Sequence, residues 1–548
     1  MVATAPTKPA KTFASARTAL APDLAHFRRR YPETVAGLGA LPMREEWLRR
    51  IWELETNWRA DWETRGGAYS EEESVVFGPP PARREAEGEF DAVYAGGAAA
   101  LLHAAALACG HERRVLVIGG ARPEGEAGGA WNLSEDELKE LEGAGVFTRE
   151  EVEGAVVNRY RGSFVKFHDA ASRVKAGPLW VTGALDVVVD VERLTALAAA
   201  RLARLAPKGC AVEKSLRFVR AYVEPSRVTV EAEGTGGARR FFNARLLVDA
   251  SGADSPVARQ LNGGRGAAAR VRPSVGTVAR GYVRGEGRDE ADFRSGEILV
   301  STEDASAHRQ LLWEGFAGSP ARGDYSTRIF FHDTTDSPAD KSLLALFERY
   351  FESLPAYKRR GAGWRVERPV FGYAHAPREG WRTKRRVACD RVLLLGDAGL
   401  GAGAFAAPGA RGDVGELRRV ARGTDAALTS GALDAGALTQ VCDGSVGRVA
   451  AAFGLSEFMR PAAKGAPHAV NETLNALAAA LGGLEEGERR AVFRGRMTTG
   501  ALRRLLARTA RLYPRIFARV REHFGARGTL CWLAGLAEAA WKERVGGQ

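Results

Sequence analysis

Cysteine is scarce in this sequence, and the few cysteines present form no recognisable pattern. Five are scattered over 548 residues, with no C-x-x-C pair and no histidine at the spacing of a metal site. This usage is typical of reduced structural thiols in a non-secreted protein. A disulfide framework and a metal site are therefore not expected.

Long apolar runs are also missing. The longest uncharged stretches, around residues 93–110 and 398–410, are rich in Gly and Ala and predict turns and short helices, not membrane spans. No recognised nucleic-acid-binding module occurs, yet the net charge of +12 favours an anionic partner. We therefore predict a protein that is soluble or peripheral to an anionic membrane surface and does not bind nucleic acid.

The N-terminal residues have a biased composition. Residues 1–22 contain Ala, Thr, Ser, Pro and basic residues, and the first acid is Asp23. This composition is typical of an organelle transit segment, which favours the chloroplast, either in the stroma or on the thylakoid. It is equally that of a disordered bacterial tail on a cytoplasmic protein peripheral to the membrane.

Residues 44–64 carry apolar side chains at helical spacing: Trp47, Ile51, Leu54, Trp58 and Trp62. The stripe predicts a helix packed on the main body, and the alternative is a surface that faces carotenoid or lipid.

The chain is organised around Phe90–Ser134, which predicts a strand, a glycine turn, a helix and a parallel strand. The template G-x-G-x-x-G aligns with Ala95, Gly97 and Ala100, so only its central glycine is kept, and Gly96 supplies flexibility to the turn. The ribose-binding acid is expected near Gly119 and Gly120, at the end of the second strand, and is missing there, since the next carboxylate is Glu124. The pattern favours a dinucleotide-binding unit, and the alternative is a βαβ unit that binds nothing.

Two later strand ends have the same character. One strand ends in Asp249-Ala250-Ser251-Gly252, and another, from Arg391, ends in Gly396-Asp397-Ala398. Between them, residues 275–375 predict an antiparallel sheet interrupted by a helix over about 341–354. Strand ends of this kind present backbone to a bound dinucleotide in doubly wound sheets.

From Glu416 onward the pattern is helical. One apolar stripe is surrounded by arginines and consists of Leu502, Leu505, Leu506, Leu512, Tyr513, Ile516, Phe517, Val520 and Phe524. It predicts either a face packed on the core or a basic amphipathic element on a membrane surface.

The order of the three strand-end motifs is that of FAD-dependent oxidoreductases. The stretches YAGGAAALLHAAALA, AWNLSEDELKELEGAGVFTREEV, LVDASGADSPVARQLNGGR and WEGFAGSP make the chain similar to Cru-type lycopene cyclases, in particular the CruP-like paralogues. The similarity departs from the family before Trp131, at Gly128-Gly129-Ala130, and after Ala398, where residues 399–411 replace the family loop.

The resemblance implies an α/β fold: a Rossmann-like FAD-binding domain, an inserted antiparallel β-sheet substrate domain and a C-terminal helical region. We place a transit or disordered segment at 1–40, a helical extension and linker at 41–88, the FAD-binding domain at 89–270 and 376–430, the substrate domain at 271–375 and the helical region at 431–548. The expected cofactor is FAD, in reduced form for activity, and the expected substrate is an apolar carotenoid. The expected cofactor-binding residues are Gly96, Gly97, Ala100, Trp131, Asn132, Asp249, Gly252, Gly396, Asp397 and Ala398.

Non-redox ring closure requires a proton donor. A carboxylic acid that stays protonated among aromatic residues meets that requirement, and Glu314, in Leu312-Trp313-Glu314-Gly315-Phe316, has this setting. The alternative for Glu314 is an edge-strand glutamate paired with an arginine. Three functions stay open: a carotenoid cyclase, an FAD oxidoreductase acting on an isoprenoid or other apolar molecule, and a degenerate homologue that binds carotenoid or a partner protein without chemistry.

Overall fold

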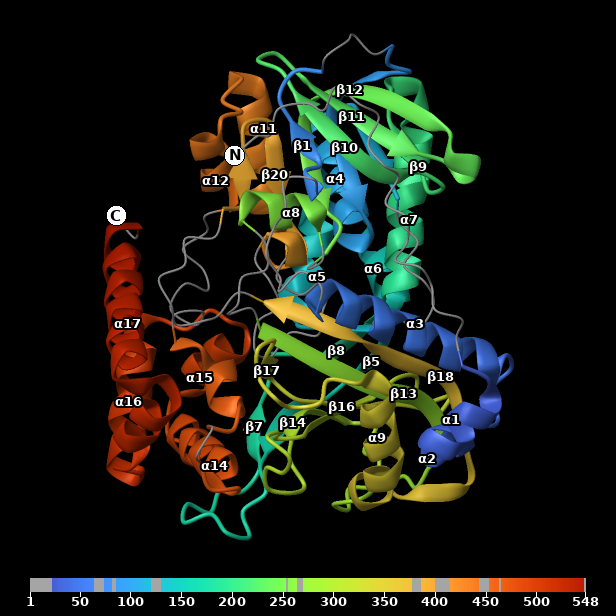
Figure 1. Cartoon of the computed structure of the whole chain (residues 1–548). Coiled ribbons are helices and arrows are strands. Elements are labelled where there is room, and N and C mark those ends of the chain that lie inside the picture. Colours follow the sequence, from blue (N-terminus) through green and yellow to red (C-terminus); the bar gives the residue numbers. More distant parts are fainter. Residues whose placement is uncertain are drawn as a thin grey trace.

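Two large sheets, a small third sheet and the helices that cover them make up the computed structural model of the protein (Figure 1). It describes residues 22–63, 73–80, 85–119, 130–252, 255–263, 270–376, 386–399, 414–442, 453–462 and 465–546. The N-terminal segment 1–21 therefore lies outside the described residues. Figure 1 shows the first sheet above the second, with the last helices along one side.

The first sheet is built on the predicted βαβ unit. Strand β2 (Glu89–Gly96) leads into α4 (Ala98–His111), and β3 (Val115–Ile118) pairs with β2 in parallel. All four side chains of β3 are buried, as expected for a parallel strand covered on both faces. The predicted βαβ unit is therefore confirmed.

The remaining strands of this sheet extend it on both sides. Their order is β1-β10-β11-β12-β2-β3-β9, and β20 pairs with β12 and with β19. The strands are β1 (Val76–Phe77), β9 (Ala211–Glu213), β10 (Arg217–Val223), β11 (Val228–Glu233), β12 (Arg239–Ala250), β19 (Ala388–Cys389) and β20 (Val392–Leu394). Strand β12 pairs in parallel with both β2 and β20.

Helices cover the first sheet. The core around α4 also contains α7 (Val191–Arg204), α11 (Leu417–Ser430) and α12 (Ala435–Cys442). Two capping boxes begin α5 (Glu135–Gly143) and α6 (Arg149–Ala155), where Ser134 and Thr148 accept from the N–H groups three residues on. The predicted starts of both helices are confirmed.

The second sheet is larger than the stretch 271–375 predicted. Its order is β17-β13-β16-β15-β14-β6-β7, with β18 on β13. The strands from the predicted stretch are β13 (Arg270–Tyr282), β14 (Ser295–Val300), β15 (Leu312–Ala317), β16 (Asp324–Phe330), β17 (Asp333–Thr334) and β18 (Arg360–Ala376). The other two, β6 (Gly162–Lys166) and β7 (Leu179–Val181), come from residues that we placed in the first domain. Because β6 runs parallel to β14, the sheet is mixed and not purely antiparallel.

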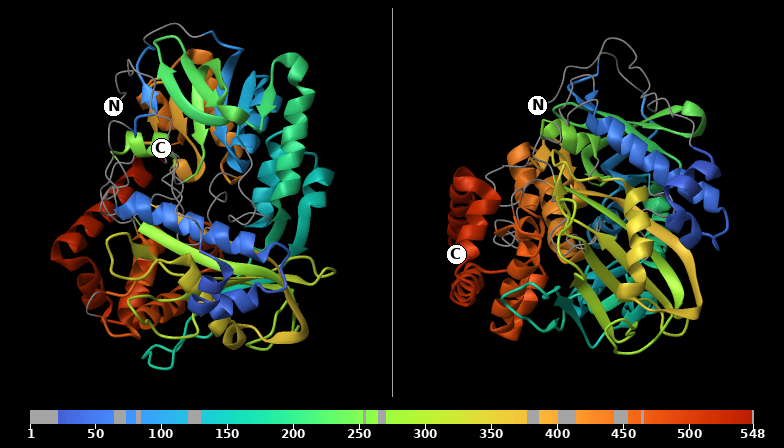
Figure 2. Two further views of the ribbon diagram at one scale, coloured as in Figure 1. Left: turned by 45° about the vertical axis from the view of Figure 1, so that its right-hand side comes forward. Right: turned by 60° about the horizontal axis from the view of Figure 1, so that its bottom comes forward.

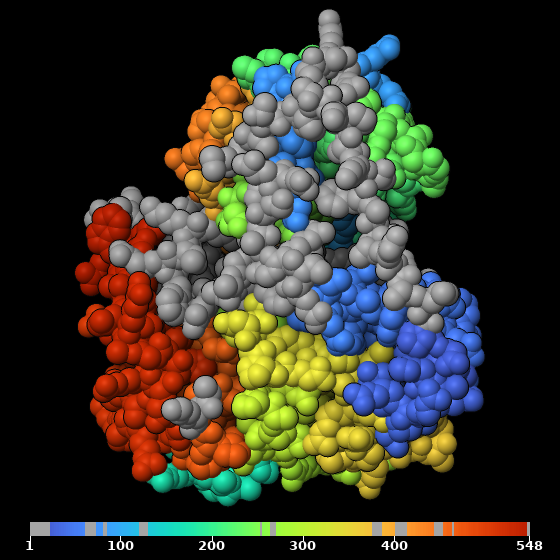
Figure 3. Space-filling view, viewed as in Figure 1, coloured from blue at the N-terminus to red at the C-terminus, as the bar shows by residue number. Residues whose placement is uncertain are grey.

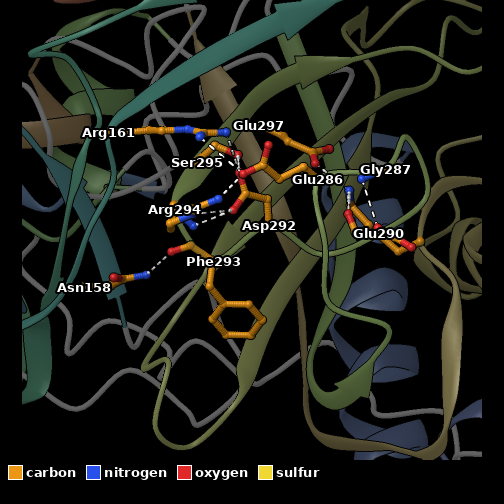
Figure 4. Close-up of polar contacts among 11 residues, drawn as sticks. Asn158, Arg161, Glu286, Gly287, Glu290, Asp292, Phe293, Arg294, Ser295 and Glu297 are labelled. Atoms are coloured by element: carbon orange, nitrogen blue, oxygen red, sulfur yellow. Dashed lines mark hydrogen bonds and ion pairs between the residues drawn. The ribbon is translucent and has the colours of Figure 1, made fainter.

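A small third sheet lies close in the chain to β6. It has the order β4-β8-β5, from β4 (Ala130–Leu133), β5 (Val156–Arg159) and β8 (Val187–Asp190). Polar contacts join this part of the chain to the start of β14 (Figure 4). Asn158 donates to the carbonyl oxygen of Phe293 over 3.0 Å, and Asp292 lies between Arg161 and Ser295. These contacts attach the third sheet to the second.

One face of the second sheet is covered by α9 (Leu343–Tyr357), which falls where a helix was predicted, and by α1 (Leu24–Arg30), α2 (Pro32–Gly37) and α3 (Arg44–Glu63). Helix α3 lies along β18 (Figures 1 and 2), where Trp47 contacts Phe371 and Trp58 stacks on Tyr373 with 4.4 Å between ring centroids. The stripe of α3 is thus a packing face over these residues. The side chain of Trp62 lies outside the described residues.

The last helices pack on the other side of the second sheet. They are the short helix η5 (Leu455–Met459), α14 (Ala469–Gly482), α15 (Glu486–Phe493), α16 (Thr499–Leu512) and α17 (Ile516–Gly546). Their core includes Leu312 and Phe330 of the sheet. In the part of the chain that the structure describes, no helix is long and apolar enough to span a bilayer.

Candidate functional site at the carboxyl edge of the first sheet

The three strand-end motifs of the sequence meet at one edge. In the parallel pairing of β12, Ala250 lies opposite Gly96 of β2, and Asp249 lies opposite Leu394 of β20. The N–H of Leu395 donates to the carbonyl oxygen of Asp249 over 2.9 Å, immediately before Gly396. The glycine turn, the D-A-S-G segment and the G-D-A segment therefore lie side by side at the carboxyl ends of the strands, where open α/β sheets bind ligands.

Gly96 is required by the backbone at this edge. Its φ is +140°, and a Cβ built there would lie 2.3 Å from the carbonyl oxygen of Ala250. Gly97 then precedes α4 without a side chain of its own, and Ala100 is fully buried against the core. The amino end of α4 thus presents backbone N–H groups and its positive dipole end at the sheet edge, which suits a pyrophosphate.

Asp249 acts within its own turn. It is 1% exposed, and its carboxylate accepts from the N–H of Ser251 over 2.9 Å and from the hydroxyls of Ser251 and Ser255. Burial raises the pKa of Asp249, and these three hydrogen bonds oppose the rise. The side chain therefore fixes the turn that leads to Gly252, whose φ of +101° is suited to glycine. Ser255 in turn caps α8 (Pro256–Leu261).

The G-D-A segment forms a single helical turn, η4 (Gly396–Ala398). Gly396 has a φ of +61°, Ala398 is fully buried, and Asp397 is half-buried at the sheet edge. The loop that departs from the lycopene cyclases begins at Gly399, and its remaining residues, 400–411, lie outside the described residues.

Trp131 and Asn132 belong to a different sheet from the three motifs. Both lie on β4, which pairs with β8, and Trp131 packs into the core around α4. The Oδ1 atom of Asn132 is buried and accepts no hydrogen bond from the described residues. A buried acceptor without a donor suits a ligand N–H. Residues 120–129, which include Glu124, are outside the described part, so the ribose-binding position is not defined.

The residues at this edge fit a dinucleotide cofactor. A glycine crossing with no room for a Cβ and a helix amino end are the features that such a group needs from the protein at a sheet edge. In the described residues, no group of three or more His, Cys, Asp or Glu could hold a metal ion.

Glu314 lies away from this edge, on β15 in the second sheet. It is 8% exposed, and β15 lies between β14 and β16, so it is not on an edge strand. Its cross-strand partner is Arg328, whose guanidinium lies 3.9 Å from the Glu314 carboxylate. Trp313 faces the opposite way and stacks on Tyr357 of α9, as strand alternation predicts, while Phe316 stacks on Tyr160. The structure thus places both an arginine and an aromatic pair near Glu314.

The sequence analysis missed a cluster of buried charges on the same sheet face. Arg270 pairs opposite Thr334, Ser274 opposite Phe330, and Gly276 opposite Arg328. Because side chains alternate along a strand, Arg270 and Arg272 share the face of Arg328 and Glu314. Arg270 and Arg272 are 4% and 5% exposed. The sequence feature that could have indicated Arg270 and Arg272 is the R-V-R pattern at the start of β13. In the sequence alone, this pattern resembles a strand with one face in solvent.

The charges of this cluster come from five separate parts of the chain. Arg270 forms an ion pair with Glu457 of η5, Arg460 lies 3.5 Å from Glu457, and Lys341 lies 3.1 Å from Asp333. Burial alone would raise the pKa of Glu457, but the charges of Arg270 and Arg460 and the nearby His523 of α17, whose Nε2 lies 3.6 Å from the carboxylate, lower it to about 2. The cluster fixes the start of β13 against η5 and α17.

His332 lies next to these arginines, between β16 and β17. Burial lowers its pKa well below the ordinary value, and the charges of Arg272, Arg270 and Arg460 lower it further. Its Nε2 atom is buried and has no hydrogen-bond partner among the described residues. The imidazole is therefore neutral at pH 7.

No protein-family model and no curated protein sequence matches this chain. Similar solved structures exist. A geranylgeranyl bacteriochlorophyll reductase-like protein from Thermoplasma acidophilum is 14% identical over 79% of this chain and 99% of its own, with a TM-score of 0.51. The halogenase PltM is 15% identical over 83% and 97%, with a TM-score of 0.53.

A third similar structure is the flavin-dependent brominase Bmp2, 11% identical over 79% of this chain and 99% of its own, with a TM-score of 0.52. A variant of PltM was solved with FAD bound, and its TM-score is also 0.52. At these identities the likeness concerns the fold. The predicted fold class is thereby confirmed, and the chain has the fold of Rossmann-type, FAD-binding flavoproteins.

Proposed function

We propose that this protein is an FAD-dependent enzyme that acts on an isoprenoid or similarly apolar molecule. The observation that carries the flavin part is the convergence of Gly96, Asp249 and Gly396 at one sheet edge. Each of the three segments contributes backbone groups to the proposed flavin site. These groups are present even though only the central glycine of the G-x-G-x-x-G template is kept. The flavoprotein fold of the chain supports the same conclusion.

The isoprenoid part rests on weaker support, which is of two kinds. One solved structure with the same fold is described as geranylgeranyl bacteriochlorophyll reductase-like. The sequence resemblance to lycopene cyclases favours a carotenoid and, more specifically, a non-redox ring closure with reduced FAD. The buried setting of Glu314, on the same face of β15 as Phe316, is the observation that favours this second, narrower function.

For the flavin, the chain would contribute backbone groups and one side chain. The N–H groups at the start of α4 would bind the pyrophosphate, the Asp249 turn would hold Gly252 in place, and Asp397 would accept hydrogen bonds at the end of β20. When bound, a flavin supplies either hydride transfer or, in its reduced form, a negative charge near the substrate.

For a cyclase, Glu314 would have to donate a proton to a terminal alkene. A neighbouring double bond would then attack the carbocation, and loss of a proton would close the ring. A cation beside a carboxylate stabilises the charged form of the carboxylate. Arg328 therefore opposes proton donation by Glu314 unless its guanidinium moves away or pairs with another group. Glu314 therefore stays a candidate acid whose protonation must be measured.

The flavin proposal is tested by the visible spectrum of the purified protein and by reconstitution with FAD. Wild type is expected to carry or take up one flavin per chain, and Asp397→Ala to lower the flavin content. Asp390→Ala, at the other end of β20, is the matched control and should keep it. Protein that is colourless and takes up no FAD would contradict the proposal.

The two chemistries are separated by product analysis with reduced flavin. A cyclase converts lycopene to an isomer of unchanged mass, whereas a reductase adds two hydrogens per double bond. For the cyclase, Glu314→Gln should abolish ring formation with flavin content unchanged, and Glu286→Gln, on the exposed loop before β14, should not. Cyclic product made equally well by Glu314→Gln would remove Glu314 as the acid, and no conversion at all by flavin-loaded wild type would favour a non-catalytic homologue.

A further inference from the structure

The C-terminal helices expose apolar side chains that no part of the described chain covers. Seven large hydrophobic residues are exposed among the described residues, and five of them lie between residues 512 and 541. These five are Leu512 at 49%, Phe517 at 70%, Leu530 at 68%, Leu533 at 51% and Trp541 at 62% exposure. For the stripe Leu502–Phe524 the sequence left open a face packed on the core or a membrane-surface element, and most of that stripe is buried, as the first alternative requires.

The second half of α17 is apolar on two faces. Its inner face, with Trp532 and Ala539, is buried in the core. Leu530, Leu533 and Trp541 recur at helical spacing with Ala537 between them, so they form one outer row. Helices of soluble proteins that bury one face normally carry polar residues on the other, so this outer row indicates a surface that is covered in use.

The charge around this row indicates which kind of partner covers it. Ten Lys or Arg and only three Glu lie between Thr499 and Gly546, which is more than half of the net charge of +12. Several of these arginines are exposed and make no ion pair with a carboxylate of the described residues: Arg503, Arg508, Arg511, Arg515, Arg521, Arg527 and Arg544. Arg527 and Arg544 lie at the two ends of the outer row, on the same side of the helix.

We propose that this surface, the outer row of α17 together with Phe517 and the flanking arginines, docks on the surface of an anionic lipid bilayer. Leucine and phenylalanine would enter the boundary between headgroups and acyl chains, tryptophan would sit at the headgroup level, and the arginines would bind lipid phosphates. Figure 3 shows α16 and α17 forming one outer side of the molecule, and both views of Figure 2 show them at its periphery. They can therefore contact a plane without displacing either sheet. This proposal does not depend on the proposed function.

The test is co-sedimentation of the full-length protein with vesicles of phosphatidylcholine alone or of phosphatidylcholine mixed with phosphatidylglycerol, which gives the vesicle a negative surface potential. Wild type should bind the anionic vesicles, and binding should weaken as salt rises. The triple variant Leu530→Ser/Leu533→Ser/Trp541→Ser should bind on the order of tenfold more weakly or worse. Arg521→Gln and Arg527→Gln should each lower the affinity about fivefold.

The matched control changes the two exposed hydrophobic residues that lie elsewhere. Met43→Ser/Trp180→Ser, at 68% and 42% exposure, should bind as wild type does. All substituted side chains are exposed, and unchanged thermal unfolding would show that each variant is folded. A wild type that does not bind anionic vesicles, or a triple variant that binds as well as wild type, would overturn the proposal. A different combination of results would also overturn it: the wild type is a dimer in analytical ultracentrifugation, the triple variant is a monomer, and the variant still binds vesicles. That combination would assign the row to contact with a second copy.

Discussion

The edge of the first sheet and the face of the second sheet make different demands on the sequence. At the edge, the candidate site is made of backbone: a glycine crossing, a helix amino end and two strand ends that register brings together. On the face, it is made of side chains from strands and helices far apart in the chain, such as Arg270, Arg328 and Glu457. A site made of backbone groups tolerates substitutions of side chains but not changes of backbone conformation. A site made of side chains is sensitive to the substitution of each of them.

The largest expected effect comes from changing conformation at the edge. Gly96→Ala places a methyl group on the carbonyl of Ala250 and forces an alanine to a φ of +140°. We expect the free energy of unfolding to fall by about 4 kcal/mol or more, with loss of flavin binding. Urea unfolding and FAD titration measure these effects. Gly110→Ala, in α4 with ordinary contacts only, is the control, and equal behaviour of the two variants would show that the crossing is not constrained.

On the side-chain face, the largest effect should come from removing one charge of a buried pair. Arg270→Met keeps most of the volume but removes the ion pair of Glu457, which is fully buried, with Arg270. We expect a loss of about 3 kcal/mol in the free energy of unfolding. Arg294→Met, whose guanidinium is 67% exposed in its pair with Glu286, should cost less than about 1 kcal/mol. Similar losses from both would mean that the cluster around Glu457 is solvated.

The two regions should also differ in their response to acid. Burial lowers the pKa of His103, which bonds to Tyr94 behind the glycine turn, to about 4. The unfolded chain binds a proton below pH 6.5 and the folded chain only near pH 4, so this group removes stability as pH falls between those values, by on the order of 3 kcal/mol. Glu457, with a pKa of about 2 against 4.5 when unfolded, removes stability only as pH falls from 4.5 towards 2.

His103→Gln should therefore remove about 3 kcal/mol of the loss of stability between pH 6.5 and 4. The rest of the loss in this window comes from His332 and His523, whose pKa values burial also lowers, and the loss below pH 4 stays in place. Chemical unfolding at a series of pH values, read by circular dichroism, distinguishes the two windows. A wild-type profile that is flat above pH 4.5 would mean that His103 is protonated in the folded state.

The same contrast explains which features the sequence predicted. The βαβ unit, the capping boxes and the three strand ends follow from local patterns, so Gly96, Asp249 and Gly396 could be named as neighbours before their geometry was known. The pairing of Arg270 with Glu457 could not, because 187 positions separate them and only the packing of η5 on β13 brings them together. For the same reason we placed residues 162–166 and 179–181 in the first domain, since the pairing of β6 with β14, and of β7 with β6, joins distant parts of the chain. The exposed row of α17 was missed because its outer and inner faces are both apolar, and periodicity alone does not tell them apart.

The smallest expected effect concerns Glu314 and Arg328, a pair that is consistent either with an ion pair or with a protonated carboxyl. Glu314 and Arg328 approach only to 3.9 Å, so a double-mutant cycle with Glu314→Gln and Arg328→Gln should give a coupling energy of about 0.5–1 kcal/mol at pH 7 if the carboxyl is ionised. If Glu314 is protonated, as proton donation to an alkene requires, no ion pair exists and the coupling should fall to near zero. A coupling of that size would identify Glu314 as a charged partner of Arg328, and the general acid of any cyclisation would then have to be sought elsewhere on this face, whereas a coupling near zero would leave Glu314 as the candidate acid.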